Sequence, residues 1–301
     1  MGLPPLVGSR LLSTQFNAVP VVLVLLALAG YLWCVRRVNR LQPRHPWSGG
    51  KTAAFVAALV VVCLAVMSFI GVYQQELFWD HMVQHLMFVM VASPLFAIAS
   101  PVDLVWRAST GRLRRRVTAA LRSRPSRLVA HPIVAFALYA VMIPLTHLTS
   151  WYDYTIEHAA WDNAEHLVFL CIGYLFWRQI FGSDPNRVRL HPGAQFLYLF
   201  LAIPIDTFTG LSLDQASHEL FPAYLAFHRT WGVGPVLDLH TGGVIMWVGG
   251  DTLMLWPMIP VALRWMHLEE RRADRSDAEL DAAAYHGPDP DGDHPVARLV
   301  P

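Results

Sequence analysis

The sequence predicts an all-α, polytopic membrane protein with seven transmembrane helices, its N-terminus outside and its C-terminus inside. Of the 301 residues, 54% are hydrophobic and only 15% are charged, and the mean hydropathy is +0.38. Such a composition is too apolar for a soluble chain of this length. The net charge of +1 gives no indication of a nucleic-acid-binding surface, because the basic residues are separated into alternate loops.

Seven apolar runs are long enough to cross a hydrocarbon core about 30 Å thick. We expect the spans at about residues 16–35, 52–72, 78–100, 132–148, 157–178, 192–211 and 241–263. Pro94 lies inside the third run and should kink it, since proline cannot donate a helical hydrogen bond. A short outer segment (1–15) would precede the membrane domain (16–268). The polar, acidic remainder (269–301) is expected to be a disordered cytoplasmic tail.

The distribution of basic residues predicts the orientation. With the N-terminus outside, all of the 23 Lys and Arg residues except Arg10 and Arg229 fall in inner segments, as the retention of positive charge in the cytoplasm requires. Residues 27–29 resemble a signal-peptidase site. Cleavage there would force the arginines that follow across the membrane, so we expect an uncleaved first helix.

Two chemistries can be set aside on residue content. Cys34, Cys63 and Cys171 lie far apart in apolar runs without a C-x-x-C pair, so we interpret them as small core residues. A retinal protein needs a lysine within a helix to form its Schiff base. The only lysine, Lys51, falls at the inner end of the second run, which excludes that class.

Two histidines head the third run. His81 and His85 are four residues apart, so on a helix they lie one turn apart on one face, an arrangement that a transition metal can use. Met82 lies between these two histidines, and Met246 lies in the last run. Thioether sulfur is a suitable ligand for Cu(I). Two histidines are only half a site. The alternative is that they bond to neighbouring helices at the interface and that the methionines fill apolar space.

The fifth run carries a second group of polar residues. His158, Asp162 and Glu165 recur along one stripe, with His166 on its flank. At 1.5 Å of rise per residue, His158 and His166 are about 12 Å apart along the axis and cannot share one ion. A site would therefore take one of them together with ligands from the third or seventh run.

Further acids fall within the apolar runs. Asp206 and Asp251 lie in the sixth and seventh runs, where an ionisable group is costly and by default a candidate for function. The alternative is a structural hydrogen bond between helices. His240 precedes the glycine pair 242–243 and either adds a ligand or is a loop residue, whereas the glycines favour close helix packing.

Three short motifs occur in order along the third, fifth and seventh runs. They are His81-Met82-x-x-His85-Leu86 followed by Ala92-Ser93-Pro94, then His158 to Glu165-His166-Leu167-x-Phe169, and finally Gly242-Gly243-x-Ile245-Met246-Trp247. Together they resemble the CtaG-type multi-span cytochrome c oxidase assembly factors of bacteria. The resemblance extends from the second run to the seventh.

The resemblance implies a non-enzymatic protein of the bacterial plasma membrane that handles copper at the outer face and acts on cytochrome c oxidase subunits. Some relatives carry a fused copper-transport-like domain. This sequence shows none, so we expect copper to arrive from a separate carrier. The candidate metal ligands are His81, His85, His158, His166, Met82, Met246 and His240, supported by Glu165, Asp162, Asp251 and Asp206. The alternative is a haem-binding electron-transfer protein with His85 and His166 as axial ligands.

Overall fold

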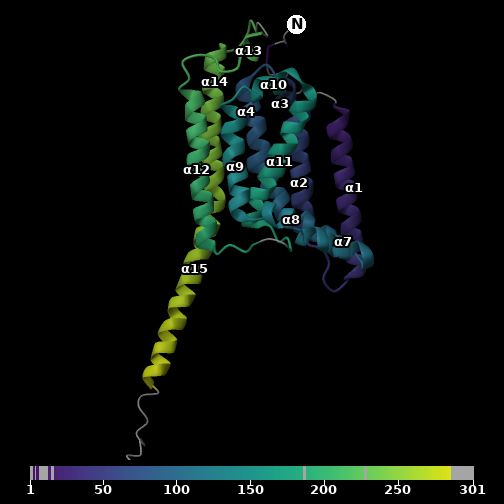
Figure 1. Cartoon of the computed structure of the whole chain (residues 1–301), viewed down its shortest axis with the longest axis vertical. Coiled ribbons are helices and arrows are strands. Elements are labelled where there is room, and N and C mark those ends of the chain that lie inside the picture. The colour runs from purple at the N-terminus through teal and green to yellow at the C-terminus, as the bar shows by residue number, and fades with distance from the viewer. Residues whose placement is uncertain are drawn as a thin grey trace, which may run out of the picture.

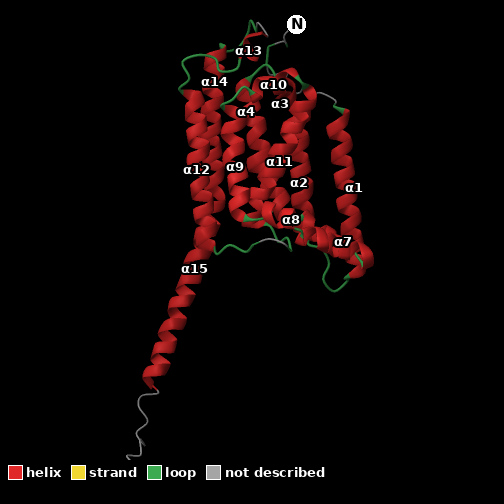
Figure 2. Cartoon of the chain, viewed as in Figure 1, coloured by secondary structure: helices red, strands yellow, loops and turns green. Residues whose placement is uncertain are grey.

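The computed structural model describes residues 3, 5–6, 13–14, 17–185, 188–226 and 229–285. These residues form helices joined by loops and contain no strand, which confirms the all-α prediction (Figure 2). The long helices run side by side in one bundle, and the last helix extends well beyond it (Figure 1). Most of the expected outer segment 1–15 lies outside the described residues.

The helices of the bundle fall where the apolar runs predict them. They are α1 (Ala18–Leu41), α2 (Gly49–Met67), α3 (Phe69–Tyr73), α4 (Phe78–Leu86), η2 (Met87–Ala92), α5 (Ser93–Ala99), α9 (Pro132–His147), α11 (Ala159–Phe181), α12 (Pro192–Asp214), α14 (Pro235–Val244), η3 (Ile245–Gly249) and α15 (Gly250–Tyr285). Shorter helices connect them at the two ends: α6 (Pro101–Ala108), α7 (Gly111–Arg122), α8 (Arg124–Val129), α10 (Trp151–Glu157) and α13 (Pro222–Ala226).

Five helical stretches among the described residues are long and apolar enough to cross a membrane. They are Ala18–Leu41, Gly49–Tyr73, Phe78–Ala108, Pro192–Asp214 and Pro235–Ala282. Helix α9 is apolar but shorter, and α11 carries acidic side chains near its start. The chain is thus a multi-pass membrane protein, while the count of seven spans and the orientation stay predictions.

The third span is irregular just before Pro94. Residues Met87–Ala92 form a π-helical turn, and the Ser93 hydroxyl donates to the Phe88 carbonyl at 2.8 Å. A proline leaves the carbonyl four residues earlier without its usual N–H partner, and a wider turn absorbs this mismatch. The irregularity next to Pro94 is therefore a π turn, and the kink expected there stays a prediction. Such turns occur often at functional sites.

Glycines allow α12 and α14 to pack closely. A Cβ atom on Gly243 would lie 2.7 Å from the Gly210 carbonyl oxygen and 2.6 Å from the Asp214 nitrogen. Only a residue without a side chain fits between these backbones. The interpretation of the glycine pair as a packing feature is confirmed.

Two predictions, for the tail from residue 269 and for the basic stretch 107–127, need correction. The tail was expected to be disordered from residue 269, but α15 continues as an exposed helix to Tyr285, and residues 286–301 lie outside the described part. Glu269 pairs with Arg272 at 3.0 Å, and alanines with high helix propensity follow, so the helix persists without apolar periodicity. The basic stretch 107–127, expected as a loop, is largely helical in α7 and α8.

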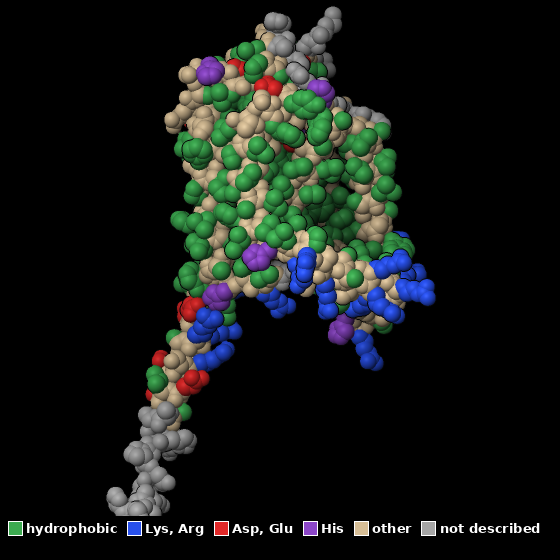
Figure 3. Space-filling view, in the orientation of Figure 1, with side chains coloured by type: hydrophobic (Ala, Val, Ile, Leu, Met, Phe, Trp, Pro, Cys, Tyr) green, Lys and Arg blue, Asp and Glu red, His purple; other side chains and the backbone are tan. Residues whose placement is uncertain are grey.

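Lys and Arg side chains gather at one end of the bundle, around α7 and along the start of the protruding α15 (Figure 3). The opposite end is closed by the short helices α10 and α13 (Figure 1). The charge pattern in the sequence therefore corresponds to a spatial division between the two ends of the molecule.

Candidate metal centre

Three histidines meet inside the bundle near the end opposite the basic cluster. His81 and His85 come from α4, and His147 is the last residue of α9. All three are buried, with 1%, 1% and 0% of their surface exposed. The ring centre of His147 lies 4.8 Å from that of His85 and 6.0 Å from that of His81. We call these three residues the histidine cluster.

Within the part of the chain that the structure describes, four of the six ring nitrogens in the cluster have no hydrogen-bond partner. They are Nε2 of His81, both nitrogens of His85 and Nε2 of His147. Leaving a buried polar group unpaired costs about 1–3 kcal/mol. Unpartnered groups are rare in folded proteins and need a specific explanation, such as an ion that is bound there.

The spacing of the rings is compatible with a shared ion. An imidazole nitrogen lies about 2.0 Å from a bound transition metal, so the ring centre lies about 3 Å away and two such centres are at most about 6 Å apart. Both measured separations lie within this limit. Within the described ranges, no group of three His, Cys, Asp or Glu side chains is already arranged around a single metal position. The imidazoles would therefore have to turn to close on an ion.

Aromatic side chains enclose the cluster. The Tyr152 ring lies 4.3 Å from His81, and Phe169 lies 4.6 Å edge-on from His85 and stacks at 6.1 Å on His147. Next to the cluster, the hydroxyls of Tyr152 and Tyr224 are 2.6 Å apart, which joins α10 to α13. Burial raises the pKa of both tyrosines well above the usual range, so these phenols are neutral at pH 7.

His166, a predicted ligand on α11, lies beside the cluster with different partners. Its Nε2 is 3.0 Å from Gln84 Oε1 and 3.6 Å from Asp162 Oδ1, and its ring packs 4.9 Å from Phe88. It is 7% exposed. The structure thus places His166 beside Gln84 of α4, with one nitrogen already bonded.

The other predicted ligands lie among other neighbours. His158 is exposed and stacks on Tyr154 with ring centres 4.3 Å apart, and His240 Nε2 donates to the Ala216 carbonyl at 2.8 Å. Met82 and Met246 are fully buried, and the Met82 side chain packs beside Gly242 on α14. His158 and His240 thus have partners other than His81 and His85.

Three of the four predicted acids accept hydrogen bonds from residues distant in the sequence, whereas both carboxyl oxygens of Glu165 have no hydrogen-bond partner among the described residues. Asp206 accepts a hydrogen bond from the Tyr139 hydroxyl at 2.6 Å, and Asp251 accepts one from the Thr207 hydroxyl at 2.7 Å. These bonds join α12 to α9 and to α15, which corresponds to the structural alternative. Asp162 accepts from Gln74 Nε2 at 3.1 Å, and Glu165 is 2% exposed.

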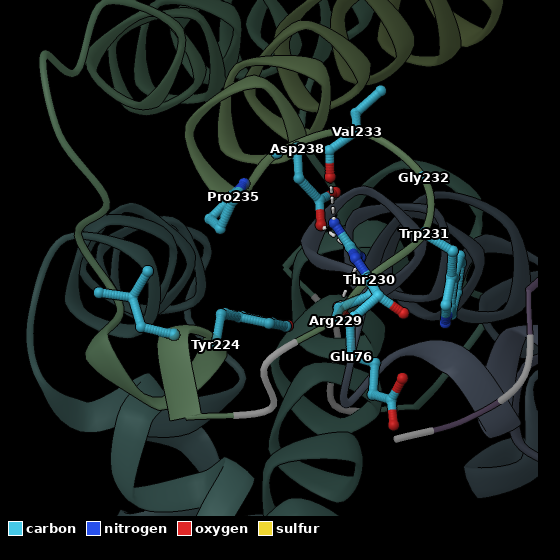
Figure 4. A pocket seen from close by; sticks show the side chains of 11 residues that line it. Glu76, Tyr224, Arg229, Thr230, Trp231, Gly232, Val233, Pro235 and Asp238 are labelled. Carbon is cyan, nitrogen blue, oxygen red and sulfur yellow. Dashed lines mark hydrogen bonds and ion pairs between the residues drawn. The ribbon is translucent and has the colours of Figure 1, made fainter. Parts of the chain in front are cut away.

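A further acid, which the sequence reasoning did not select, positions α4. The Asp238 carboxylate on α14 accepts from the backbone N–H groups of Phe78 and Trp79 at 3.3 and 3.1 Å. It also pairs with Arg229 Nη1 at 3.1 Å, beside a cavity of about 290 Å³ that Tyr224 helps to line (Figure 4). Asp238 thereby caps the N-terminus of the helix that carries His81 and His85.

The fold and the site together define a class: a multi-pass helical membrane protein with a closed, aromatic-walled histidine cluster in its bundle. The family model of the cytochrome c oxidase caa3 assembly factors matches residues 29–267. The chain belongs to this family, and the resemblance drawn from the three motifs is confirmed.

Longer mycobacterial proteins are similar to this chain. An uncharacterized protein of Mycobacterium bovis is 26% identical over 291 residues, which cover 93% of this chain, and an uncharacterized protein of Mycobacterium leprae is 24% identical over 278 residues, which cover 90%. The matches cover only 43% and 41% of those two relatives, so the chain spans less than half of their length. No solved structure matches the chain.

Proposed function

We propose that this member of the caa3 assembly factor family acts in cytochrome c oxidase biogenesis by handling copper at the outer face of the bacterial plasma membrane. The observation that carries the proposal is the histidine cluster, in which four buried ring nitrogens have no hydrogen-bond partner. Imidazole is a good ligand for copper. Copper is the cargo in this proposal, received from a separate carrier and passed to oxidase subunits; the protein catalyses no reaction.

The proposed topology has seven spans with the N-terminus outside. Helix α4, which carries His81 and His85, lies toward the end of the bundle where α10 and α13 are found, and α7 lies at the other end (Figure 1). Lys and Arg side chains gather around α7 (Figure 3). Since positive charge is retained in the cytoplasm, this separation supports an outer position for the cluster. From this position the protein could pass copper to an oxidase copper centre that receives its metal on the outer side of the membrane.

The haem alternative is not favoured. Its two axial ligands, His85 and His166, would have to face each other across a porphyrin. Phe169 packs edge-on against His85, and Phe88 packs against His166, so side chains fill the space beside each ring. His166 also uses Nε2 in its bond to Gln84.

The test is the state of the oxidase in a deletion strain. If the protein supplies copper, the oxidase subunits should be synthesised but poor in copper, and inactive with an artificial electron donor. Added copper should restore part of the activity, since the client ligands can capture abundant copper unaided. A fully metallated, active oxidase would contradict the proposal, and an oxidase that is metallated but starved of electrons would support the haem alternative.

A further inference from the structure

We propose that His147 is the third ligand of a Cu(I) site that it forms with His81 and His85, and that His81 and His147 bind the ion through Nε2. The inference rests on the proposed function, which leaves the ligand set open. It adds a residue from a different helix, 66 positions along the chain from His81, that no helical spacing indicates.

Hydrogen bonds fix the tautomer of His147. Its Nδ1 lies 2.8 Å from the Ile143 carbonyl oxygen, and a carbonyl can only accept. The Thr146 hydroxyl, also 2.8 Å from Nδ1, donates its own proton to the Met142 carbonyl at 2.9 Å. Nδ1 therefore carries the hydrogen. The lone pair is on Nε2, which is buried and has no partner.

A longer chain of hydrogen bonds fixes His81 in the same way. Gln74 Nε2 donates to the Asp162 carboxylate at 3.1 Å, so the amide must turn its oxygen, Oε1, toward His81 Nδ1 at 3.3 Å. Nδ1 again carries the hydrogen, and the Nε2 lone pair is free. A histidine that donates one N–H to an acceptor in the protein and offers its other nitrogen is the usual arrangement of a metal ligand.

His85 completes the group because both of its nitrogens lack partners, so either can turn toward the ion. The same reasoning excludes Nε2 of His166. Gln84 Nε2 donates to the Ala65 carbonyl at 2.7 Å, so Gln84 Oε1 faces His166 and must accept a hydrogen from its Nε2. The site therefore has three imidazole ligands.

The surroundings favour a monovalent ion. The three ligands are neutral and the rings nearest to them are aromatic, with the carboxyl groups of Glu165 and Asp162 further out, close enough to interact with Tyr152. The cost of burying an ion in such a medium rises with the square of its charge, so Cu(I) is favoured over a divalent ion. Cu(I) also accepts three ligands without the square-planar geometry that Cu(II) prefers.

The experiment measures Cu(I) binding to the purified full-length protein in detergent under reducing, anaerobic conditions, by competition with a coloured Cu(I) chelator. We expect one Cu(I) per chain, and X-ray absorption should show three nitrogen neighbours at about 2.0 Å and no sulfur. The decisive variant is His147→Asn. The asparagine amide can still donate to the Ile143 carbonyl but has no atom at the Nε2 position, so the protein should fold normally and bind Cu(I) at least about tenfold more weakly.

Two further variants separate ligands from neighbours. His158→Ala, at an exposed histidine outside the cluster, should bind Cu(I) as the wild type does. Gln74→Leu removes the acceptor of His81 Nδ1 and should weaken binding about 10- to 100-fold while the three nitrogen neighbours remain. Unchanged affinity in a folded His147→Asn protein, a sulfur neighbour, or tighter binding of Zn(II) than of Cu(I) would overturn the inference.

The outcomes for the site and for the function differ. If the purified protein binds no Cu(I) but the deletion strain makes an oxidase poor in copper, the site is refuted and the assembly role stands. If His147→Asn abolishes Cu(I) binding but cells that carry it make a copper-replete oxidase, the site stands and the copper-handling function fails.

Discussion

Replacing Asp238 with alanine should destabilise the bundle because it leaves a charge buried without its counter-ion. The side chains of Arg229 and Asp238 are only 8% and 3% exposed, and the carboxylate also accepts from two N–H groups at the start of α4. Removing one partner of a buried ion pair costs about 3–5 kcal/mol. Among the described residues, Arg229 would keep the carbonyls of Glu76 and Val233, at 2.8 and 2.6 Å, and the Trp231 ring, at 5.3 Å, and none of these carries a negative charge.

The assay is equilibrium unfolding of the purified protein in mixed micelles of increasing denaturing detergent, followed by tryptophan fluorescence. The control is the double variant Asp238→Leu/Arg229→Met, which replaces both charges with apolar groups. It should recover most of the lost free energy of unfolding, although the N–H groups of Phe78 and Trp79 stay without an acceptor. The reasoning would be refuted by an Asp238→Ala protein within about 1 kcal/mol of wild type, or by a double variant no more stable than the single one.

Three further predictions follow from the fold. Gly243→Ala would push a methyl group into the backbone of α12 and should cost about 1–3 kcal/mol, whereas Gly30→Ala on α1 meets no atom within 4 Å and should be neutral or slightly stabilising in the same unfolding assay. A reporter active only in the cytoplasm should work when fused after Arg116 and be silent after Thr230; activity at Thr230 would refute the topology. Tyr152→Phe breaks the hydroxyl contact that closes the cluster and should speed Cu(I) exchange with the chelator. Because the pKa of this phenol is raised by burial, the difference should be the same at pH 6 and pH 9.

The sequence predicts the elements well because each is specified locally. Every expected apolar run corresponds to helix, since a membrane span must satisfy its own backbone hydrogen bonds. The π turn before Pro94 likewise has a local cause. The helix through 269–285 was missed because apolar periodicity was taken as the criterion, whereas charge pairs and alanine are enough to hold an exposed helix.

The candidate site is predictable only within single helices. The spacing of His81 and His85 places them on one face of α4, but nothing in the spacing shows that this face meets the end of α9, where His147 lies. The same holds for Asp238. Capping patterns in a sequence identify residues adjacent to a helix start, and this cap comes from α14, about 160 residues away. Contacts between helices depend on their rotation and depth, which packing decides.

The bonds that a buried polar group makes between helices say more about its role than its depth in the membrane does. Asp206 and Asp251, which depth alone favours as functional, each accept an interhelical hydrogen bond through Oδ2, while Oδ1 has no partner among the described residues; such bonds average about 0.6 kcal/mol in membrane bundles. The histidine cluster instead leaves four buried nitrogens unpaired, each at a cost of about 1–3 kcal/mol. The folded chain tolerates this larger penalty while it supplies acceptors for Nδ1 of His81 and of His147, so that the free lone pairs lie on Nε2. A site that takes up an ion and releases it again needs free lone pairs on neighbouring ligands, which the three imidazoles of the histidine cluster offer.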